Sequence, residues 1–247
     1  MTIIHSRYIS AGGVALILVF WEVACRLFEV PDFILPAPTV ILSAALLKAP
    51  LLLPHAGVTA LEILLGVLLS LIIALPLATA MFAYPAIERA LAPFLVVSQA
   101  IPVFALAPLL VVWLGYGIAS KVLMAAIIIF FPITVSLFEG YKNCDREYVV
   151  FFRLMGAGFW DTLRLLCWPW ALPFFFAGLK VGVTVATIGA VIGEWVGAQR
   201  GLGYVMIQAN ARLNVDLVFA AILWLSCMGL FLWGLVGFME RRVIHWR

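Results

Sequence analysis

The sequence is short of charge, and this limits what kind of protein it can be. Asp, Glu, Lys and Arg make up 11% of its 247 residues, while apolar residues make up 66%. Soluble domains carry about 25% charged residues, so the composition excludes an ordinary soluble protein. The net charge of +3 is small and spread along the chain, which gives no basic surface for nucleic acid. We therefore expect a membrane protein that has no nucleic-acid partner.

Motifs for catalysis and metal binding are missing too. The chain has no Gly-xxxx-Gly-Lys-Ser/Thr loop for phosphate, so we expect no ATP hydrolysis here. Its 3 histidines are scattered, its 4 cysteines show no metal-ligand spacing, and no serine or cysteine stands in a nucleophile motif. Gly201-Leu-Gly203 follows no strand-like run and lacks the third glycine of a dinucleotide fingerprint. The sequence therefore predicts no catalytic site, no metal site and no cofactor in this chain.

Long apolar runs dominate what is present. A helix needs roughly 20 apolar residues to cross a hydrocarbon core of about 30 Å, and the chain has room for about six such spans. The first run is too long for an ordinary signal peptide and no small-residue cleavage site closes it, so we interpret it as a membrane helix. The predicted fold class is an all-α polytopic membrane protein. The expected spans are residues 9–28, 57–82, 92–114, 119–137, 171–196 and 218–239.

The loops indicate how the chain lies in the membrane. Five prolines between residues 29 and 56 forbid one continuous helix there, and residues 39–47 form a short helix suited to the interface. Of the 15 Lys and Arg residues, nine fall on the side of the N-terminus, five fall on the other side and Lys180 lies inside a span. The positive-inside rule therefore places both termini and residues 150–173 in the cytoplasm.

Residues 150–173 form the only long stretch that mixes charge with helix-forming residues. Together with the acidic residues before them they make up residues 145–173, which we call the crosswise segment. Two acids precede a helix-compatible run, Gly156 and Gly158 then permit a turn, and a second helix follows. Pro169 and Pro173 mark the start of the fifth span. A short helix fixed between two spans cannot move without moving them, so a partner protein could push on it. The alternative is an ordinary basic cytoplasmic loop.

The crosswise segment resembles a known loop. Gly156-Ala157, followed by Leu-Leu-Cys-Trp-Pro-Trp-Ala-Leu-Pro, is similar to the cytoplasmic Glu-Ala-Ala…Gly…Leu-Pro loop of type I ABC importer permeases. The sequence departs from that loop where Val150, Phe151 and Phe152 replace Glu-Ala-Ala. The resemblance implies that the loop docks into a groove of an ATPase subunit, where an aromatic plug can replace polar contacts. The implied coupling residues are Val150, Phe151, Phe152, Arg153, Gly156, Ala157, Pro169, Leu172 and Pro173.

Further stretches extend the resemblance over nearly the whole chain and narrow it to one branch of the family. They are residues 35–38, 99–109, 113–117, 193–198, 201–204 and 240–242. The branch contains the permeases for nitrate, sulfonates, taurine and thiamin-pyrimidine precursors. Residues 208–212 and 216–220 look most like the pyrimidine-precursor permeases.

The resemblance implies a permease subunit that carries a small polar organic solute across the inner membrane. A thiamin-type pyrimidine precursor is the first candidate, and sulfonate, taurine or nitrate are the others. The implied partners are a second copy of the chain, ATPase subunits that hold ATP and Mg²⁺, an extracytoplasmic solute-binding protein and the lipid bilayer. The expected organisation is an N-terminal span with an outer proline-rich segment (1–56), a type-1 permease domain (57–240) and a short basic cytoplasmic tail (241–247).

The fifth span has two distinct sides. At about 100° per residue, a polar side made of Lys180, Thr184, Thr187 and Glu194 covers an arc of roughly 80°. Because charges are costly inside a bilayer, we predict that this side lines a solute path, with Glu194 near its outer mouth and Lys180 near its inner one. The alternative is that each charge reaches an interface or pairs with a neighbouring helix. The opposite side carries glycines that let another backbone come close, namely Gly178, Gly182, Gly189 and Gly193.

Four more residues lie at membrane depth. Glu22 and Glu62 are acids, and we favour helix–helix hydrogen bonding over solute binding for both. Pro102 and Pro108 should break or kink the third span.

Two other classes of function remain open at this point. An ion-coupled secondary transporter would need no ATPase, but should show inverted repeats and more buried ionisable residues. A polytopic membrane enzyme needs a clustered catalytic site, and the sequence shows none.

Overall fold

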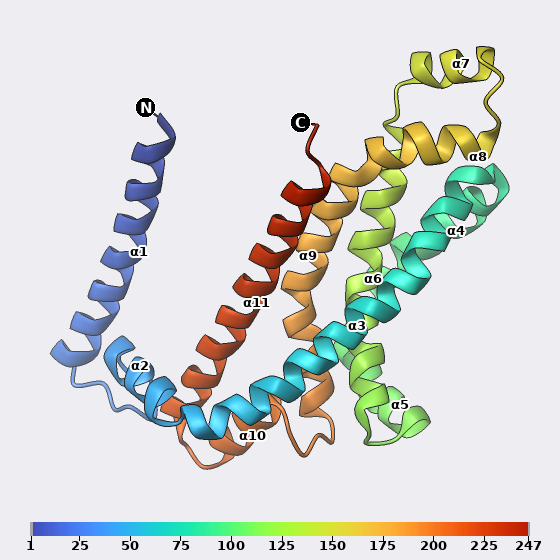
Figure 1. The fold of residues 1–247 in the computed structure, drawn as a ribbon. Helices are drawn as coiled ribbons and strands as arrows, with labels where there is room; N and C mark the ends of the chain where they lie inside the picture. The colour runs from blue at the N-terminus through green and yellow to red at the C-terminus, as the bar shows by residue number, and fades with distance from the viewer. Residues whose placement is uncertain (1, 247) are drawn as a thin grey trace.

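The computed structural model describes the backbone of residues 2–246 and the side chains of residues 12–246. Within that range every regular element is helical (Figure 1), as the sequence predicts. The elements are α1 (Thr2–Leu27), α2 (Pro38–Leu47), α3 (Ala49–Ala83), α4 (Pro85–Ala100), α5 (Val103–Leu114), α6 (Ile118–Lys142), α7 (Arg146–Leu154), α8 (Phe159–Thr162), the π-helical turn η1 (Leu163–Cys167), α9 (Trp168–Trp195), α10 (Leu202–Ala211) and α11 (Val215–Val243).

Four helical stretches of the described chain are long and apolar enough to cross a membrane. They are α3, α6, α11 and the continuous stretch Phe159–Trp195, which joins α8, η1 and α9. A fifth crossing exists if α4 and α5 count as one bent span. The predicted first span, residues 9–28, falls on α1, but its first residues lie outside those whose side chains are described. The six-span count therefore stays a prediction.

The third predicted span is not one straight helix. α4 ends at Ala100, α5 begins at Val103, and the two helices meet at 98°. Ile101 between them has extended backbone angles (φ −77°, ψ 121°), which is the conformation that a following proline imposes. Pro102 thus breaks the span as predicted, whereas Pro108 lies inside α5.

The second span is longer than predicted, because α3 begins at Ala49 and not at about residue 57. Pro50 lies in the first turn of α3, where a backbone N–H has no acceptor within the helix, so the missing N–H of proline costs no hydrogen bond. Pro54 follows inside the helix. The proline-rich segment therefore breaks before α3, and its last two prolines belong to the span itself.

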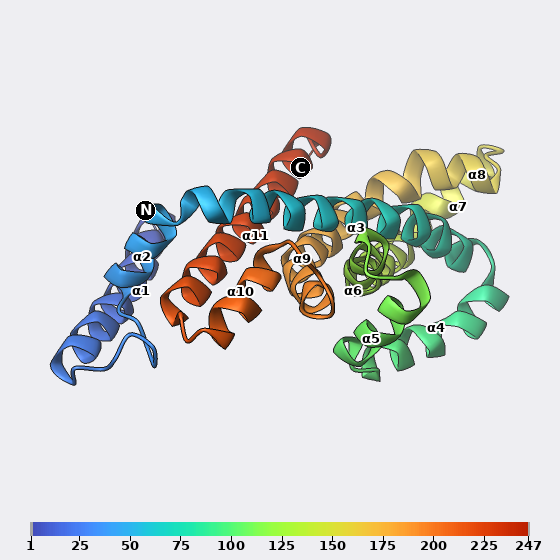
Figure 2. The same cartoon turned by 90° about the horizontal axis from the view of Figure 1, so that it is seen from below.

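The centre of the molecule is the contact of α9 with α6, and α3 runs across both (Figure 2). The glycine side of α9 faces α6. A Cβ atom added to Gly178 would lie 2.5 Å from the Pro132 carbonyl oxygen, and one added to Gly189 would lie 2.9 Å from the Ala125 Cα. At Gly182 and Gly193 the nearest α6 atoms would be 3.1 Å away. The two backbones therefore approach as closely as only glycine allows.

Helix α1 lies at the edge of the molecule beside α2 (Figures 1 and 2). The Glu22 carboxylate accepts hydrogen bonds from the Thr39 backbone N–H (3.0 Å) and the Thr39 hydroxyl (2.8 Å) in the first turn of α2. The Trp21 ring also packs edge-on against Phe219 of α11, with 5.9 Å between ring centres. Glu22 is therefore a helix–helix hydrogen-bonding residue, as predicted.

Candidate functional site

The crosswise segment is built as a helix, a glycine turn and a second helix. Asp145 caps α7 by accepting the Glu147 N–H at 2.9 Å. After α7 the backbone reverses at Gly156, whose φ of +83° suits only glycine without strain. Asp161 then accepts the Gly158 N–H at 3.3 Å where α8 begins. Each turn of the segment is thus specified by its own residues.

The second helix of the segment differs from the prediction, because it does not end before the fifth span. The helix runs unbroken from Phe159 to Trp195. In η1 the Trp168 N–H donates to the Leu163 carbonyl, five residues back, and Pro169, which has no N–H to donate, follows directly. The wider turn lets the helix pass the proline without a break. The second helix of the crosswise segment is therefore continuous with the fifth span, and α7 joins it through the glycine turn.

Packing ties the segment to three long helices. The Tyr141 ring at the end of α6 stacks on Phe82 of α3, with 5.1 Å between centres, and Phe82 also contacts Phe159 at 6.2 Å. Leu163 and Cys167 of η1 are buried in the same cluster. A displacement of the segment must therefore displace α3, α6 and α9.

The outer surface of the segment carries several exposed apolar side chains beside its charged residues. Val150 and Phe151 of α7 are 54% and 56% exposed, and Leu154 and Met155 are 81% and 72% exposed. The segment lies at one end of the bundle, across the long helices, at the same end as the first turn of α1 and the last turn of α11 (Figure 1). We call this surface, formed by Val150, Phe151, Leu154, Met155 and Trp160, the docking face. An exposed apolar patch of this kind indicates a protein–protein contact.

The nine predicted coupling residues divide into two groups in the structure. Residues 150–153 lie on α7, with Phe152 half-buried, and Gly156 and Ala157 form the turn after it. Leu172 is buried, and Pro169 and Pro173 are half-buried, within the first turns of α9. The first group can contact a partner directly, whereas the second group lies where the crosswise segment joins α9.

The four polar residues of α9 are not brought onto one open face. The Lys180 ammonium group pairs with Glu240 of α11 and lies 5.6 Å from the centre of the Trp233 ring. Glu194 is only 1% exposed and accepts a hydrogen bond from Thr59 of α3 at 2.6 Å. Both charges therefore have partners on neighbouring helices, which is the alternative that the sequence left open.

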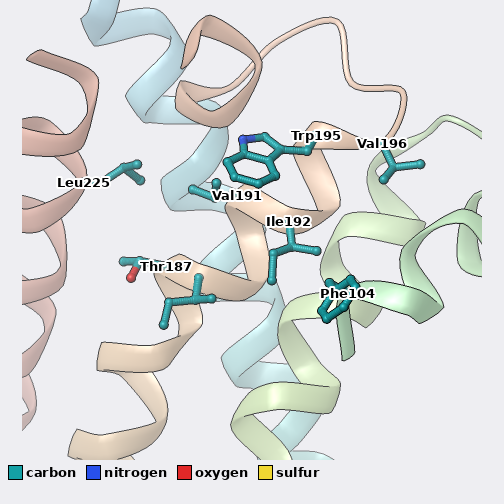
Figure 3. A pocket seen from close by; sticks show the side chains of 8 residues that line it. Phe104, Thr187, Val191, Ile192, Trp195, Val196 and Leu225 are labelled. Carbon is teal, nitrogen blue, oxygen red and sulfur yellow. The ribbon is translucent and has the colours of Figure 1, made fainter. Parts of the chain in front are cut away.

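Thr184 and Thr187 remain at the open surface of α9. They lie in a groove of about 640 Å³ between α9 and α11, which Ser226, Leu230 and Trp233 also line. Next to it is a second hollow of about 600 Å³, whose lining residues include Thr187, Phe104, Trp195 and Leu225 (Figure 3). We call the two together the α9–α11 groove. Its wall is apolar and aromatic, with hydroxyl groups from Thr184, Thr187 and Ser226.

Sequence reasoning missed a set of polar residues around Glu194. Lys121 counts as a loop residue in the sequence, yet it is 2% exposed in the structure. Thr59 and His55 on α3 also contact this region. The available signal was the pair of glycines at 201 and 203, which leave room for a carboxyl group.

Comparison with known proteins agrees on one family. The sequence matches the family described as binding-protein-dependent transport system inner membrane component over residues 66–245. It is 43% identical over 234 residues to a "probable ABC transporter permease protein" of Haemophilus influenzae, which covers 94% of each chain. It is 38% identical to the formylaminopyrimidine transport permease protein ThiX of Halalkalibacterium halodurans, covering 94% of this chain and 93% of that one. It is 40% identical to the riboflavin transport system permease protein RibX of Chloroflexus aurantiacus, covering 94% and 87%.

A solved structure has the same fold. A chain of the MetNI methionine ABC transporter, in an inward-facing conformation, superposes with a TM-score of 0.71 at 17% sequence identity. The match covers 79% of this chain and 97% of that chain. At this identity the likeness concerns the fold alone.

Proposed function

Because the chain belongs to the family of binding-protein-dependent transport system inner membrane components, as an ABC importer permease subunit, we propose the assembly in which it works. Two copies of the chain associate with two ATPase subunits and with an extracytoplasmic solute-binding protein. This chain has no phosphate-binding loop, so ATP and Mg²⁺ are held by the ATPase subunits. Both termini and the crosswise segment face the cytoplasm, which agrees with the excess of Lys and Arg on that side.

The crosswise segment is the contact with the ATPase. The observation that carries this proposal is the exposed docking face. It belongs to a segment whose second helix packs against α3, α6 and α9. Phe151, Leu154 and Met155 supply apolar and aromatic anchors for a groove in the partner. Val150, Phe151 and Phe152 stand where the loop that this segment resembles carries Glu-Ala-Ala.

The continuous helix from Phe159 to Trp195 transmits the motion. When the ATPase subunits close, they move the crosswise segment, and the attached helix tilts with it. Thr184 and Thr187 lie on this same helix, so the tilt changes the shape of the α9–α11 groove. A second copy of the chain closes the open side of the groove and completes the path.

Thr184 and Thr187 line the solute path, while Lys180 and Glu194 hold the helices that surround it. The two charges already have protein partners, so solute binding would require each of them to lose a contact. The groove offers hydroxyl groups and aromatic rings from Phe104, Trp195 and Trp233. We rank a small heteroaromatic solute, such as a thiamin-type pyrimidine precursor, above sulfonate, taurine or nitrate. The similarity to permeases named for formylaminopyrimidine and riboflavin supports this order.

Solute uptake into proteoliposomes tests the proposed function. The full assembly should take up solute only when ATP is supplied on the ATPase side and the binding protein is present. Dissipating ion gradients should leave uptake unchanged. Uptake that continues without ATP while an ion gradient is kept would instead support a secondary transporter and overturn the proposal.

A further inference from the structure

A buried polar cluster lies at the end of the bundle opposite the crosswise segment, where α10 is found (Figure 1). Its members are Thr59 and Glu62 of α3, Lys121 of α6 and Glu194 of α9, and each is at most 3% exposed. Ionisable groups at membrane depth are costly and persist where they serve a purpose. The solute path described above does not use this cluster.

The cluster caps the N-terminus of α10 with side chains from other helices. The Gly201 N–H donates to His55 Nδ1 at 3.0 Å, and the Leu202 N–H donates to the Thr59 hydroxyl at 2.9 Å. The Gly203 N–H donates to the Glu194 carboxylate. The first N–H groups of a helix have no partner within the helix itself, and here α3 and α9 supply partners for those of Gly201, Leu202 and Gly203. Glu194 also places its negative charge at the N-terminus of α10, where the helix dipole favours it.

The hydrogen bonds assign a proton. Glu194 accepts from the Thr59 hydroxyl through Oε1 at 2.6 Å and from the Gly203 N–H through Oε2, so both of its oxygens act as acceptors. The Glu62 carboxyl group is also hydrogen-bonded to Glu194. A contact between two carboxyl groups needs one donor, and only Glu62 can supply it. Its Oε2 atom has no hydrogen-bond partner among the described residues.

Lys121 supplies the balancing positive charge. Its ammonium group donates to the carbonyl oxygens of Tyr116 (2.6 Å) and Gly117 (3.1 Å) in the loop between α5 and α6. Both Glu62 and Glu194 lie within its electrostatic reach. The loop between α9 and α10 fits around the acid because it carries glycines. Any side chain at Gly201, where φ is +117°, would overlap the Glu194 carboxyl group.

We infer that Thr59, Glu62, Lys121 and Glu194 form an outer latch, with Glu194 ionised and Glu62 holding the proton, that fixes α10 on α3 and α9. Glu194 is a positioning residue, not a solute ligand. The surface that it positions includes a hollow of about 200 Å³ lined by His55, Tyr204 and Arg212. The role of that surface as the meeting place of the solute-binding protein rests on the proposed function, whereas the latch itself does not.

The same substitution at the two acids should have opposite results. In Glu62→Gln the neutral amide still donates to Glu194, so the latch should remain. In Glu194→Gln the amide NH₂ faces N–H and O–H donors and the latch should open. We expect the Gly201–Tyr204 amides of Glu194→Gln to exchange hydrogen about tenfold faster, the effect of losing a helix cap. Binding-protein-stimulated ATP hydrolysis should fall at least severalfold in Glu194→Gln alone.

Further variants keep the test decisive if Glu194→Gln folds poorly. Thr59→Ser preserves the hydroxyl and should match the wild type, whereas Thr59→Val should speed exchange at Leu202. Asp32→Asn, an exposed acid outside the cluster, should change nothing. If both glutamine variants behave alike, the proton assignment is wrong. If neither Glu194→Gln nor Thr59→Val alters exchange in α10, the latch does not exist. Hydrogen exchange is measured on the permease alone, so it tests the latch whether or not the proposed function is right. If the wild-type assembly shows no ATP hydrolysis stimulated by the binding protein, the proposed function is overturned and the latch is not.

Discussion

At the scale of single residues, the ion pair between Lys180 and Glu240 joins α9 to α11. The two side chains are 24% and 22% exposed, so water reaches the pair only in part. These helices border the α9–α11 groove, and the pair therefore fixes the width of the groove at one end.

The variant Lys180→Met should lower the stability of the protein in detergent, because it leaves Glu240 without its partner. Breaking a fully buried pair costs about 3–5 kcal/mol, and partial exposure reduces the expected loss to about 1 kcal/mol. Thermal unfolding measures it. The double variant Lys180→Met/Glu240→Gln should regain most of the loss, and a double variant as unstable as the single one would contradict the pairing.

A methyl group at Gly178 should be far more damaging than one at Gly57. A Cβ at Gly178 would lie 2.5 Å from the Pro132 carbonyl oxygen of α6, whereas one at Gly57 meets nothing within 4 Å. We expect Gly178→Ala to cost about 1–3 kcal/mol by forcing α9 from α6, and Gly57→Ala to be neutral or slightly stabilising. Unfolding in detergent compares the two. Equal stabilities would show that α6 and α9 are not in close contact.

At the scale of elements, a contact through the crosswise segment explains why α7, an amphipathic helix with exposed apolar side chains, lies outside the bundle. The exposed Phe151, Leu154 and Met155 would be a liability on a free surface. Their helix α7 contacts α8, and α8 and η1 pack against α3, α6 and α9, which suits a contact that must carry force.

Replacing Phe151 by Glu should detach the ATPase while leaving the permease folded, since the side chain is 56% exposed. Loss of one aromatic anchor from an interface is worth about 1.4 kcal/mol or more, which is at least a tenfold weaker association. Co-purification of the ATPase with a tagged chain measures this. The control is Phe33→Glu, which is 57% exposed in the loop between α1 and α2. Full retention of the ATPase by Phe151→Glu would place the docking face elsewhere.

Patterns that are local in the chain were predictable from the sequence. Hydropathy indicated the long helices, the acids and glycines of residues 145–158 indicated α7 and its turn, and Pro102 indicated the break in the third span. The passage of the helix through Pro169 was not predictable, because it depends on a π-turn that no residue pattern marks.

At the scale of the whole molecule, contacts between distant parts of the chain decide what each charge does. Helical periodicity placed Glu194 on the same side as Thr184 and Thr187, but the loop after α9 folds back and covers it. Lys121 is buried for a related reason, because its carbonyl partners lie in the turn that precedes α6. Neither contact follows from a single helix, so the sequence could not separate a solute path from a structural cluster.

The native cysteines permit a labelling experiment on the path. Cys25, Cys144 and Cys167 are buried, and burial also raises the pKa of the Cys144 thiol above its usual value, which keeps it from reacting as a thiolate. Cys227 on α11 is exposed. In a chain with Cys227→Ser the remaining native cysteines are buried, so labelling reports on newly introduced cysteines.

The central claim is that the crosswise segment transmits ATP-driven motion to the α9–α11 groove. Its most direct test is the rate at which a water-soluble maleimide labels Thr187→Cys in the Cys227→Ser background, measured in the full assembly with and without bound ATP. The account predicts different rates in the two states, and loss of that difference when Phe151→Glu is added. Equal rates in both states, or no labelling in either, would contradict it.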